Sequence, residues 1–405
     1  MAFGSSAAID RPSATVTDPI RVMVVDDSVV VRGLIGRWID EDPALAVVAS
    51  HRNGKLAVDD VARSNPDVVV LDVEMPEMDG ITALPLLLKA KPGLVVVMAS
   101  TLTRRNAEIS LKCLSLGAAD YVPKPESNSG VTTSSDFRNE VIQKVKALGQ
   151  RAQARAGRAA QARATTAQPT GRVPFSPPGS TPAQAPARSF APSQPRVAPA
   201  APTIQTRPYS SVTPRILLIG SSTGGPQALT RLFGEIGPAI ANVPVLITQH
   251  MPATFTSILA EHITKASGRR AAEGVHGEPL MPGRIYVAPG GKHMVIGKQG
   301  AETVVLLNDQ PPVNFCKPAV DPLFDSAVPI FGSAILACVL TGMGHDGAAG
   351  AKRIADGGGS VIAQDEESSV VWGMPGAVAQ AGAAAEILPL DQIGGKIVRI
   401  LGGRR

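Results

Sequence analysis

The stretch RILLIGSSTGGPQALTRLFGEI, residues 215–236, decides how the second half of the chain folds. Residues 215–220 form a near-continuous apolar run, which is typical of a strand buried on both faces of a parallel sheet. The run breaks at a turn of small residues, and residues 227–236 follow with the spacing of an amphipathic helix. This order predicts an α/β domain in which backbone N–H groups gather at the start of the helix.

The turn at residues 221–226 fits more than one kind of site. It can cradle a phosphate, but neither of the nucleotide-binding patterns GxGxxG and GxxxxGK[S/T] is present. Residues 220–224 do match G-x-S-x-G, the pattern of a nucleophile elbow, with Ser222 at the apex. A tight glycine-rich turn without any chemistry is the third interpretation.

Two further apolar runs carry reactive side chains to the same edge of the predicted sheet. Residues 243–248 lead into His250, and residues 333–340 lead into a glycine-rich loop with Asp346. Ligand sites in such sheets lie beyond the carboxyl ends of the strands, so we expect Ser222, His250 and Asp346 to converge. They predict a hydrolytic triad, in which His250 takes the proton of the Ser222 hydroxyl and Asp346 orients the imidazole.

The same loops offer an oxyanion hole and an alternative site. Backbone N–H groups near Thr223 or Met343 are candidates for the oxyanion hole. His345 and Asp346 can instead join His250 around a metal ion, although no HExxH-like pair supports this. The order Ser…His…Asp differs from the order in α/β-hydrolases, which disfavours that family despite the G-x-S-x-G match.

Residues 215–401 resemble the catalytic domain of the chemotaxis protein-glutamate methylesterases, the CheB family. The shared stretches are, in order, IGSSTGGPQAL, ITQHMPATFT, YVAPGGKHM, NFCKPAVDPLF, LTGMGHDGAAG and VVWGMPGAV. The resemblance implies a doubly wound, mostly parallel, Rossmann-like α/β domain that needs no cofactor, with Ser222 as nucleophile, His250 as base and Asp346 as orienting acid. It also implies that glutamate methyl esters on chemoreceptors are hydrolysed to release methanol, and that certain receptor glutamines are deamidated.

The first half of the chain alternates in the same way over residues 20–148. Strand-like runs cover residues 21–25, 44–49, 67–71, 94–99 and 120–122, and helical patterns cover residues 29–40, 55–64, 105–116 and 137–148. Five strands with intervening helices predict a parallel sheet covered on both faces. The polar side chains at the strand ends are Asp26, Asp27, Asp72, Ser100, Thr101 and Lys124.

Three carboxylates at one sheet edge repel one another unless a cation lies among them. Oxygen ligands of this kind suit Mg²⁺, and a carboxylate beside Mg²⁺ can attack phosphorus to give an aspartyl phosphate. Lys124 and a hydroxyl group then stabilise the phosphoryl oxygens. Aspartates near strand ends also cap helices, but the ordered segments VVDDS, LDVEMPEMDG, MAST and YVPKP favour the phosphoryl site.

These segments resemble the response-regulator receiver domain over residues 21–148. The resemblance implies a flavodoxin-like (βα)5 fold with Asp72 as the phosphoacceptor. It gives Mg²⁺ the ligands Asp26, Asp27, Asp72 and the backbone carbonyl of Glu74. It makes Ser100 the hydroxyl that follows the phosphoryl group, Tyr121 the switch aromatic and Lys124 the cationic partner. In this family the step that corresponds to Lys124–Pro125 commonly carries a cis bond.

Charge is unevenly distributed along the 405 residues, whose net charge is +5. Residues 151–214 hold eight arginines, twelve prolines and no Lys, Asp or Glu, so they carry +8 and the remaining residues carry −3. Such a segment cannot bury enough apolar surface to fold, and we interpret it as a tether. The predicted order is a flexible tail (1–19), a receiver (20–148), a linker (149–213) and a hydrolase domain (214–405).

Composition also limits the class of protein. No apolar run approaches the roughly 18–20 residues that cross a bilayer, and residues 1–19 lack the apolar segment of a signal peptide. Three widely spaced cysteines, Cys113, Cys316 and Cys338, favour a reducing cytoplasm over a disulfide framework. We therefore expect a cytoplasmic monomer without a direct membrane insertion.

Three functions follow from these patterns. The first is a methylesterase that a chemotaxis histidine kinase activates by phosphorylating Asp72, which shifts the protein from a closed to an open arrangement. The second is a phosphorylation-gated scaffold that binds receptors without turnover, which the intact Ser, His and Asp set disfavours. The third is a DNA-binding response regulator, suggested by the basic linker. No helix-turn-helix pattern follows the receiver, so we expect no nucleic-acid partner.

Overall fold

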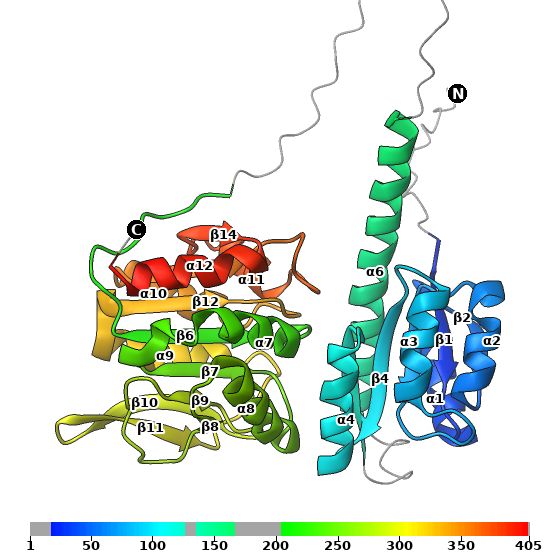
Figure 1. The fold of residues 1–405 in the computed structure, drawn as a ribbon, viewed down its shortest axis with the longest axis horizontal. Coiled ribbons are helices and arrows are strands. Elements are labelled where there is room, and N and C mark those ends of the chain that lie inside the picture. The colour runs from blue at the N-terminus through cyan, green and yellow to red at the C-terminus, as the bar shows by residue number, and fades with distance from the viewer. Residues whose placement is uncertain (1–17, 126–134, 167–203, 404–405) are drawn as a thin grey trace, which may run out of the picture. The chain divides into compact units, whose positions relative to one another are not determined.

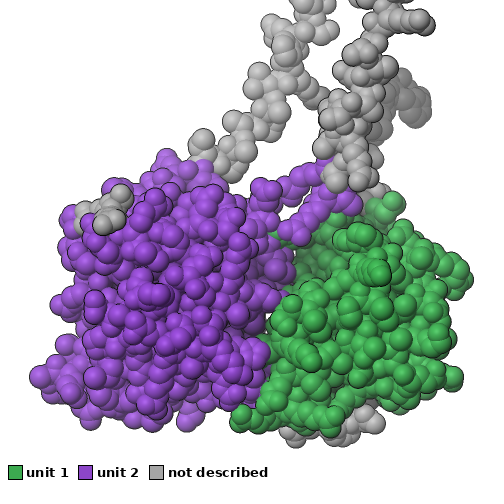
Figure 2. Space-filling model, in the orientation of Figure 1, with its two compact units in different colours: residues 1–153 green, residues 154–405 purple. Residues whose placement is uncertain are grey.

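All strand pairs of the two large sheets are parallel, as the continuous apolar runs predict. The structure is a computed structural model that describes residues 18–125, 135–166 and 204–403, without the side chains of residues 159–166 (Figure 1). Its contacts divide the chain into two units, residues 1–153 and 154–405 (Figure 2). Residues 1–17 of the predicted tail and residues 167–203 of the predicted linker lie outside the described residues.

The first unit contains a sheet of five strands in the order β2-β1-β3-β4-β5. Its strands are β1 (Ile20–Val25), β2 (Leu45–His51), β3 (Val68–Asp72), β4 (Val95–Thr101) and β5 (Asp120–Lys124). Its helices are α1 (Val29–Asp40), α2 (Gly54–Ser64), α3 (Gly80–Ala90), α4 (Arg104–Ser115) and the part of α6 (Ser135–Thr166) up to residue 153. This strand order is the flavodoxin-like one, so the predicted fold is confirmed.

Polar side chains fix where the connecting helices of this unit begin. Ser28, Asn53, Asp79 and Thr103 each accept a hydrogen bond from a backbone N–H in the first turn of α1, α2, α3 and α4. Such caps satisfy N–H groups that have no partner inside the helix. Each cap directly follows a strand or its loop, so the caps keep the strand ends and helix starts close together.

The second unit contains a sheet of seven strands in the order β14-β13-β12-β6-β7-β9-β8. Its strands are β6 (Ile216–Ser221), β7 (Val245–Gln249), β8 (Ala271–Glu273), β9 (Ile285–Val287), β12 (Ile335–Val339), β13 (Ser360–Gln364) and β14 (Glu386–Leu388). Chain order reverses at β6, because β7 lies on one side of it and β12 on the other. This doubly wound sheet confirms the predicted architecture, and β6 is its topological switch point.

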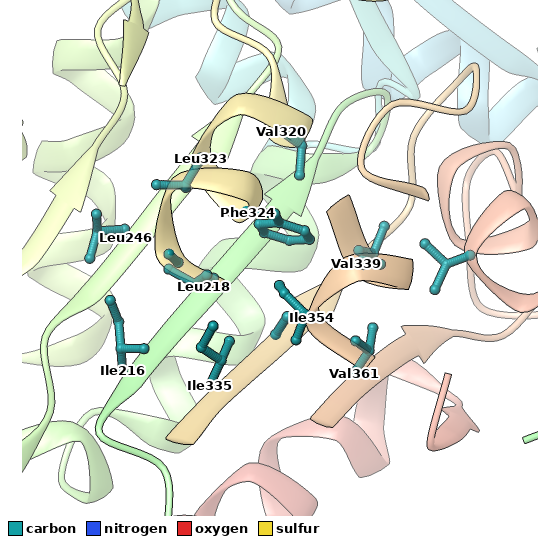
Figure 3. Packing of buried hydrophobic residues seen from close by; sticks show 14 of the residues in the cluster. Ile216, Leu218, Leu246, Val320, Leu323, Phe324, Ile335, Val339, Ile354 and Val361 are labelled. Carbon is teal, nitrogen blue, oxygen red and sulfur yellow. The ribbon is translucent and has the colours of Figure 1, made fainter. Parts of the chain in front are cut away.

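Helices cover both faces of this sheet. They are α7 (Gly225–Ile236), α8 (Ala253–Ser267), α9 (Val320–Phe331), α10 (Ala348–Asp356), α11 (Met374–Gln380) and α12 (Leu390–Leu401), with short 3₁₀ turns at Ala239–Asn242 and Gly332–Ala334. The helices form two rows: α7 contacts both α8 and α12, and α10 contacts both α9 and α11. Figure 3 shows part of the core beneath the second row, in which Val320, Leu323 and Phe324 of α9 belong to the same buried cluster as Leu218 of β6.

Other parts of the second unit had no counterpart in the sequence-based prediction. An antiparallel hairpin of β10 (His293–Gln299) and β11 (Glu302–Asn308) packs against α9. Residues 207–210 of the predicted linker bond to this unit, for example through Arg207 to Asp356 and Tyr209 to Glu386. Helix α6 also runs beyond residue 148, where the linker was expected to start. Among the described residues the one cis peptide bond is Lys317–Pro318, so the Lys124–Pro125 expectation is wrong.

None of the described helices combines the length and the apolar character that a membrane crossing requires.

Candidate functional site

The three predicted hydrolytic residues follow three neighbouring strands of the second unit. Ser222 follows the central strand β6, His250 follows β7, and Asp346 lies in the loop after β12. The backbone N–H of Ser222 donates to the carbonyl of Thr341, and the N–H of His250 donates to the carbonyl of Ser221. These bonds hold the segments after β6, β7 and β12 together at one edge of the sheet, as the sheet topology predicts.

His250 and Asp346 form a close, buried pair. The His250 Nε2 atom lies 2.7 Å from Asp346 Oδ2, and Asp346 is 1% exposed. Asp346 also accepts hydrogen bonds from the backbone N–H groups of Val320 and Asp321 and from Asn314 Nδ2. Burial alone raises the pKa of Asp346, but the hydrogen bond and charge of His250 together with these donors hold that pKa below its usual value. The carboxylate is therefore ionised at neutral pH.

The imidazole of His250 is held by two partners. Its burial lowers the pKa, but the hydrogen bonds to Asp346 and Cys316 outweigh that effect and raise the pKa of His250 above its usual value. Because Asp346 is an anionic acceptor, the neutral ring carries its proton on Nε2 and leaves Nδ1 as the basic nitrogen. Nδ1 lies 3.3 Å from the Cys316 sulfur.

Ser222 is positioned beside this pair without a hydrogen bond to it. Within the described residues, the Ser222 hydroxyl makes no hydrogen bond, and the partner of the basic nitrogen is Cys316. Catalytic hydrogen bonds are often long or absent until substrate binds. The structure thus pairs His250 with Asp346 and brings Ser222 to the same edge, while its role as nucleophile stays a prediction.

Gln249, which the sequence analysis did not single out, connects the turns that carry Ser222 and His250. It is 2% exposed, and its Oε1 accepts the Ser221 hydroxyl at 2.7 Å. Its Nε2 donates to the carbonyls of Ser222 (2.9 Å) and His250 (3.1 Å). A β-carbon at Gly225 would lie 1.9 Å from Gln249 Oε1, so only glycine lets the turn approach this amide.

The predicted oxyanion donors lie in the same turn region. Thr223 is buried, and in the described part of the chain neither its N–H nor that of Met343 donates a hydrogen bond. The N–H of Ser222 is engaged by Thr341, so it is not free for a ligand. Thr341 also donates its hydroxyl proton to the carbonyl of Thr223. Both predicted amides are therefore free to bind an anionic oxygen, and this assignment stays a prediction.

The alternative metal site receives no support from the structure. His345 is exposed. Among the residues that the structure describes, His250, His345 and Asp346 do not form a cluster of metal-ligand atoms.

A cluster of metal-ligand atoms does occur in the first unit. Oxygens of Asp26, Asp27 and Asp72 all lie within 4.8 Å of one another. Lys124 Nζ lies 2.7 Å from both Asp26 Oδ2 and Asp72 Oδ1. A β-carbon at Gly80 would lie 2.0 Å from the carbonyl oxygen of Asp72, so glycine allows the loop after β3 to fold back onto this site.

The electrostatics of Asp72 fit a cation-binding site. Burial raises its pKa, Lys124 lowers it, and the charges of Asp26 and Asp27 raise it further, to about 6 in total. The single ammonium of Lys124 therefore does not neutralise the three carboxylates. Oxygen ligands with a surplus of negative charge match the preferences of Mg²⁺, so the residues present fit this ion.

The other predicted residues of the phosphoryl site lie on the adjoining strands. Ser100, at the end of β4, is 1% exposed and bonds to the Ser110 hydroxyl at 2.8 Å instead of to Asp72. The ring of Tyr121 is buried, and Lys144 Nζ lies 5.2 Å from its centre. Glu74 is exposed, and its side chain accepts a hydrogen bond from Asn106. Their roles in switching and metal binding stay predictions.

Comparison with known proteins matches both units to families. The family model described as CheB methylesterase matches residues 217–397, and the response regulator receiver domain matches residues 22–134. The chain is 56% identical over 388 residues to the protein-glutamate methylesterase/protein-glutamine glutaminase of group 2 operon from Rhodopseudomonas palustris, covering 96% of each chain. It is also 56% identical to the protein-glutamate methylesterase/protein-glutamine glutaminase of Nitrobacter hamburgensis, covering 99% of this chain and 98% of that one. The solved CheB methylesterase catalytic domain of Thermotoga maritima is 38% identical, covers 47% of this chain and 100% of that chain, and superposes with a TM-score of 0.45.

Proposed function

The chain belongs to the CheB methylesterase family, and from that premise we propose that it is a phosphorylation-activated serine hydrolase of chemoreceptors. It hydrolyses glutamate methyl esters on the receptors, which releases methanol, and it deamidates specific receptor glutamines. The observation that carries the proposal is the buried His250–Asp346 pair beside Ser222, at the carboxyl ends of three neighbouring strands.

The reaction follows from the protonation states of these groups. With Nε2 held by the ionised Asp346, His250 Nδ1 takes the proton of the Ser222 hydroxyl as its oxygen attacks the ester carbonyl. The N–H groups of Thr223 and Met343 bind the oxyanion. The imidazolium returns the proton to the departing methoxide, which leaves as methanol. His250 then takes a proton from water as the water oxygen attacks the acyl carbonyl. The bond to the Ser222 oxygen breaks, the imidazolium returns the proton to that oxygen, and the product is glutamate. A glutamine substrate follows the same path and releases ammonia.

Cys316 is the competing nucleophile, because its sulfur and not Ser222 contacts the basic nitrogen. A thiol in contact with an imidazole that is itself bonded to a carboxylate is also the arrangement of a cysteine hydrolase. We favour Ser222 because it stands at the apex of the G-x-S-x-G turn and is followed directly by the unengaged N–H of Thr223. In this mechanism the imidazole leaves the thiol when Ser222 engages it.

The first unit supplies the control. Asp72 accepts a phosphoryl group from a chemotaxis histidine kinase, and Lys124 pairs with the new charge. Asp26, Asp27, Asp72 and the Glu74 carbonyl would hold Mg²⁺, which neutralises the phosphoryl oxygens and the carboxylates when it is bound. Ser100 and Tyr121 then respond to the phosphoryl group. We place this pathway in the cytoplasm, and we propose a monomer without a nucleic-acid partner.

The test measures methanol released from methylated receptor fragments in the presence of a small phosphodonor and Mg²⁺. We expect Ser222→Ala to abolish release and Cys316→Ala to retain it, with both variants unfolding near the wild-type temperature. Loss in Cys316→Ala with activity kept in Ser222→Ala would show that the cysteine is the nucleophile. Receptor binding without methanol release by the wild-type protein would instead indicate a scaffold.

A further inference from the structure

A four-residue turn beside the catalytic pair presents an aromatic side chain to solvent. The backbone N–H and carbonyl groups of Val313 and Cys316 are paired in both directions, at 2.9 and 3.1 Å, which closes the turn. Phe315, at its tip, is 100% exposed. A side chain in that position contributes no core packing, so the stability of the fold does not account for an aromatic ring here.

The backbone of the turn disfavours this residue as well. Asn314 and Phe315 have positive φ angles of 52° and 65°. Asparagine tolerates the left-handed region, but for a bulky residue such as phenylalanine this conformation is strained. Strained residues persist where the surrounding structure holds them, and they cluster at binding and catalytic sites.

The two neighbours of Phe315 hold the turn against the catalytic pair. Asn314 Nδ2 donates to Asp346 Oδ1 and to Asp321 Oδ2, each at 3.1 Å. On the other side, the Cys316 sulfur lies 3.3 Å from His250 Nδ1. Consecutive Cα atoms are about 3.8 Å apart. The Phe315 ring therefore starts one residue away from contacts with both His250 and Asp346.

We propose that Phe315 is a substrate-binding residue that contacts an apolar side chain of the receptor helix carrying the methyl ester. This inference rests on the proposed function and names part of its substrate site. A helix that delivers a glutamate ester to Ser222 also brings the residues three and four positions away onto the neighbouring surface. Aromatic side chains dominate the binding energy of such contacts. A ring kept exposed at a strained position next to the catalytic pair has the chemistry for this task.

The test distinguishes the effect of losing the aromatic ring from the effect of disturbing the turn. Phe315→Asn removes the ring but suits a positive φ, whereas Phe315→Tyr keeps an aromatic ring. Val275→Asn is the matched control, because Val275 is also an exposed apolar residue, at 60%, and makes none of these contacts. For each phosphorylated full-length variant, kcat and KM are measured by methanol release from a methylated receptor fragment and from a short methyl-ester peptide.

We expect Phe315→Asn to raise KM for the receptor fragment about tenfold with kcat unchanged, which corresponds to about 1.4 kcal/mol. The other two variants should match the wild type, the short peptide should be turned over equally by all, and Phe315→Asn should unfold at or above the wild-type temperature. An unchanged KM in Phe315→Asn would overturn the inference. So would full activity of unphosphorylated Phe315→Asn, because the ring would then restrain the enzyme instead of binding substrate. If the wild type releases no methanol from either substrate, the proposed function itself fails.

Discussion

Replacing Asp346 by asparagine tests whether the carboxylate sets the proton position on His250. Asp346 accepts four hydrogen bonds: Oδ2 takes those from His250 Nε2 and the Val320 N–H, and Oδ1 takes those from Asn314 and the Asp321 N–H. An asparagine has one oxygen for these four donors, and its NH₂ group must face the other pair.

Each orientation of the new amide has a defined cost. If the NH₂ group faces His250, Nε2 must become an acceptor, and the ring proton moves to Nδ1, where the base is needed. A wrong tautomer of this kind lowers kcat by about 10⁴ in the known Ser-His-Asp case, or roughly 5 kcal/mol of transition-state stabilisation. If the NH₂ group faces Asp321 and Asn314, those buried donors lose their acceptor at about 1–3 kcal/mol each.

The first orientation leaves one buried donor, the Val320 N–H, without an acceptor, whereas the second leaves two, so we expect the first to prevail. It changes both the tautomer and the stability, and both effects are measurable on one protein. We expect Asp346→Asn to reduce methanol release about 10⁴-fold and to lower the free energy of unfolding by about 1–3 kcal/mol. Asp325→Asn is the control, because Asp325 forms a partly exposed ion pair with Arg353, which is worth at most about 1 kcal/mol. Activity of Asp346→Asn within tenfold of the wild type would refute the assigned tautomer and the role of the pair.

Two further predictions follow from pKa shifts. The hydrogen bonds of Asp346 and Cys316 raise the pKa of His250, and catalysis needs the neutral imidazole. Cys316→Ala should therefore lower that pKa and move the acid limb of the kcat/KM profile to lower pH. An acid limb at the wild-type pH would contradict a contact between Cys316 and His250. The pKa of Asp72 rises from 3.8 to about 6 on folding, so its protonated form stabilises the first unit below pH about 4 and that stability is lost as the pH rises through 6. Asp72→Asn should therefore stabilise this unit by roughly 3 kcal/mol at pH 7 and by little at pH 4. The stability is measured by denaturant unfolding with hydrogen exchange of the β3 and β4 amides. The same variant should not be activated by a phosphodonor. Equal stability at both pH values would contradict the raised pKa.

The strand ends could be predicted from sequence because continuous apolar runs locate buried parallel strands. Helix α3 was not recognised, since Pro85 interrupts its pattern and proline is unfavourable inside a helix. Burial of Ala83, Leu84 and Leu87 supplies the packing energy that propensity lacks. The β10–β11 hairpin had a readable signal, because Gly300 and Ala301 form a two-residue turn between the strands.

The predicted linker shows how composition and helix propensity give different answers. The absence of acidic residues and the prolines indicate a tether, but the first part is rich in alanine, arginine and glutamine, which favour helices. Helix α6 accordingly continues from residue 148 to Thr166.

The candidate site was predicted only in part. The strand ends place Ser222, His250 and Asp346 at one edge, because the position of each follows from topology alone. Gln249 and Cys316 were missed, since their contacts depend on side-chain directions that no pattern encodes. A buried glutamine at the end of an apolar strand was the available signal for Gln249, because a buried amide requires partners.

The pKa values of two buried aspartates at sheet edges shift in opposite directions, and the difference fits the roles that we propose for them, one to orient a base and the other to carry a signal. Burial raises the pKa of both Asp346 and Asp72. Around Asp346, donors from His250, Val320 and Asn314 outweigh burial, so the anion is stable and can fix the imidazole. Around Asp72, two further carboxylates add to burial, and Lys124 compensates only in part. The anion of Asp72 is therefore destabilised relative to an aspartate in water, and a bound cation would relieve the repulsion among the three carboxylates. The carboxyl edge of a parallel sheet can thus stabilise or destabilise a carboxylate, depending on whether hydrogen-bond donors or other carboxylates surround the aspartate.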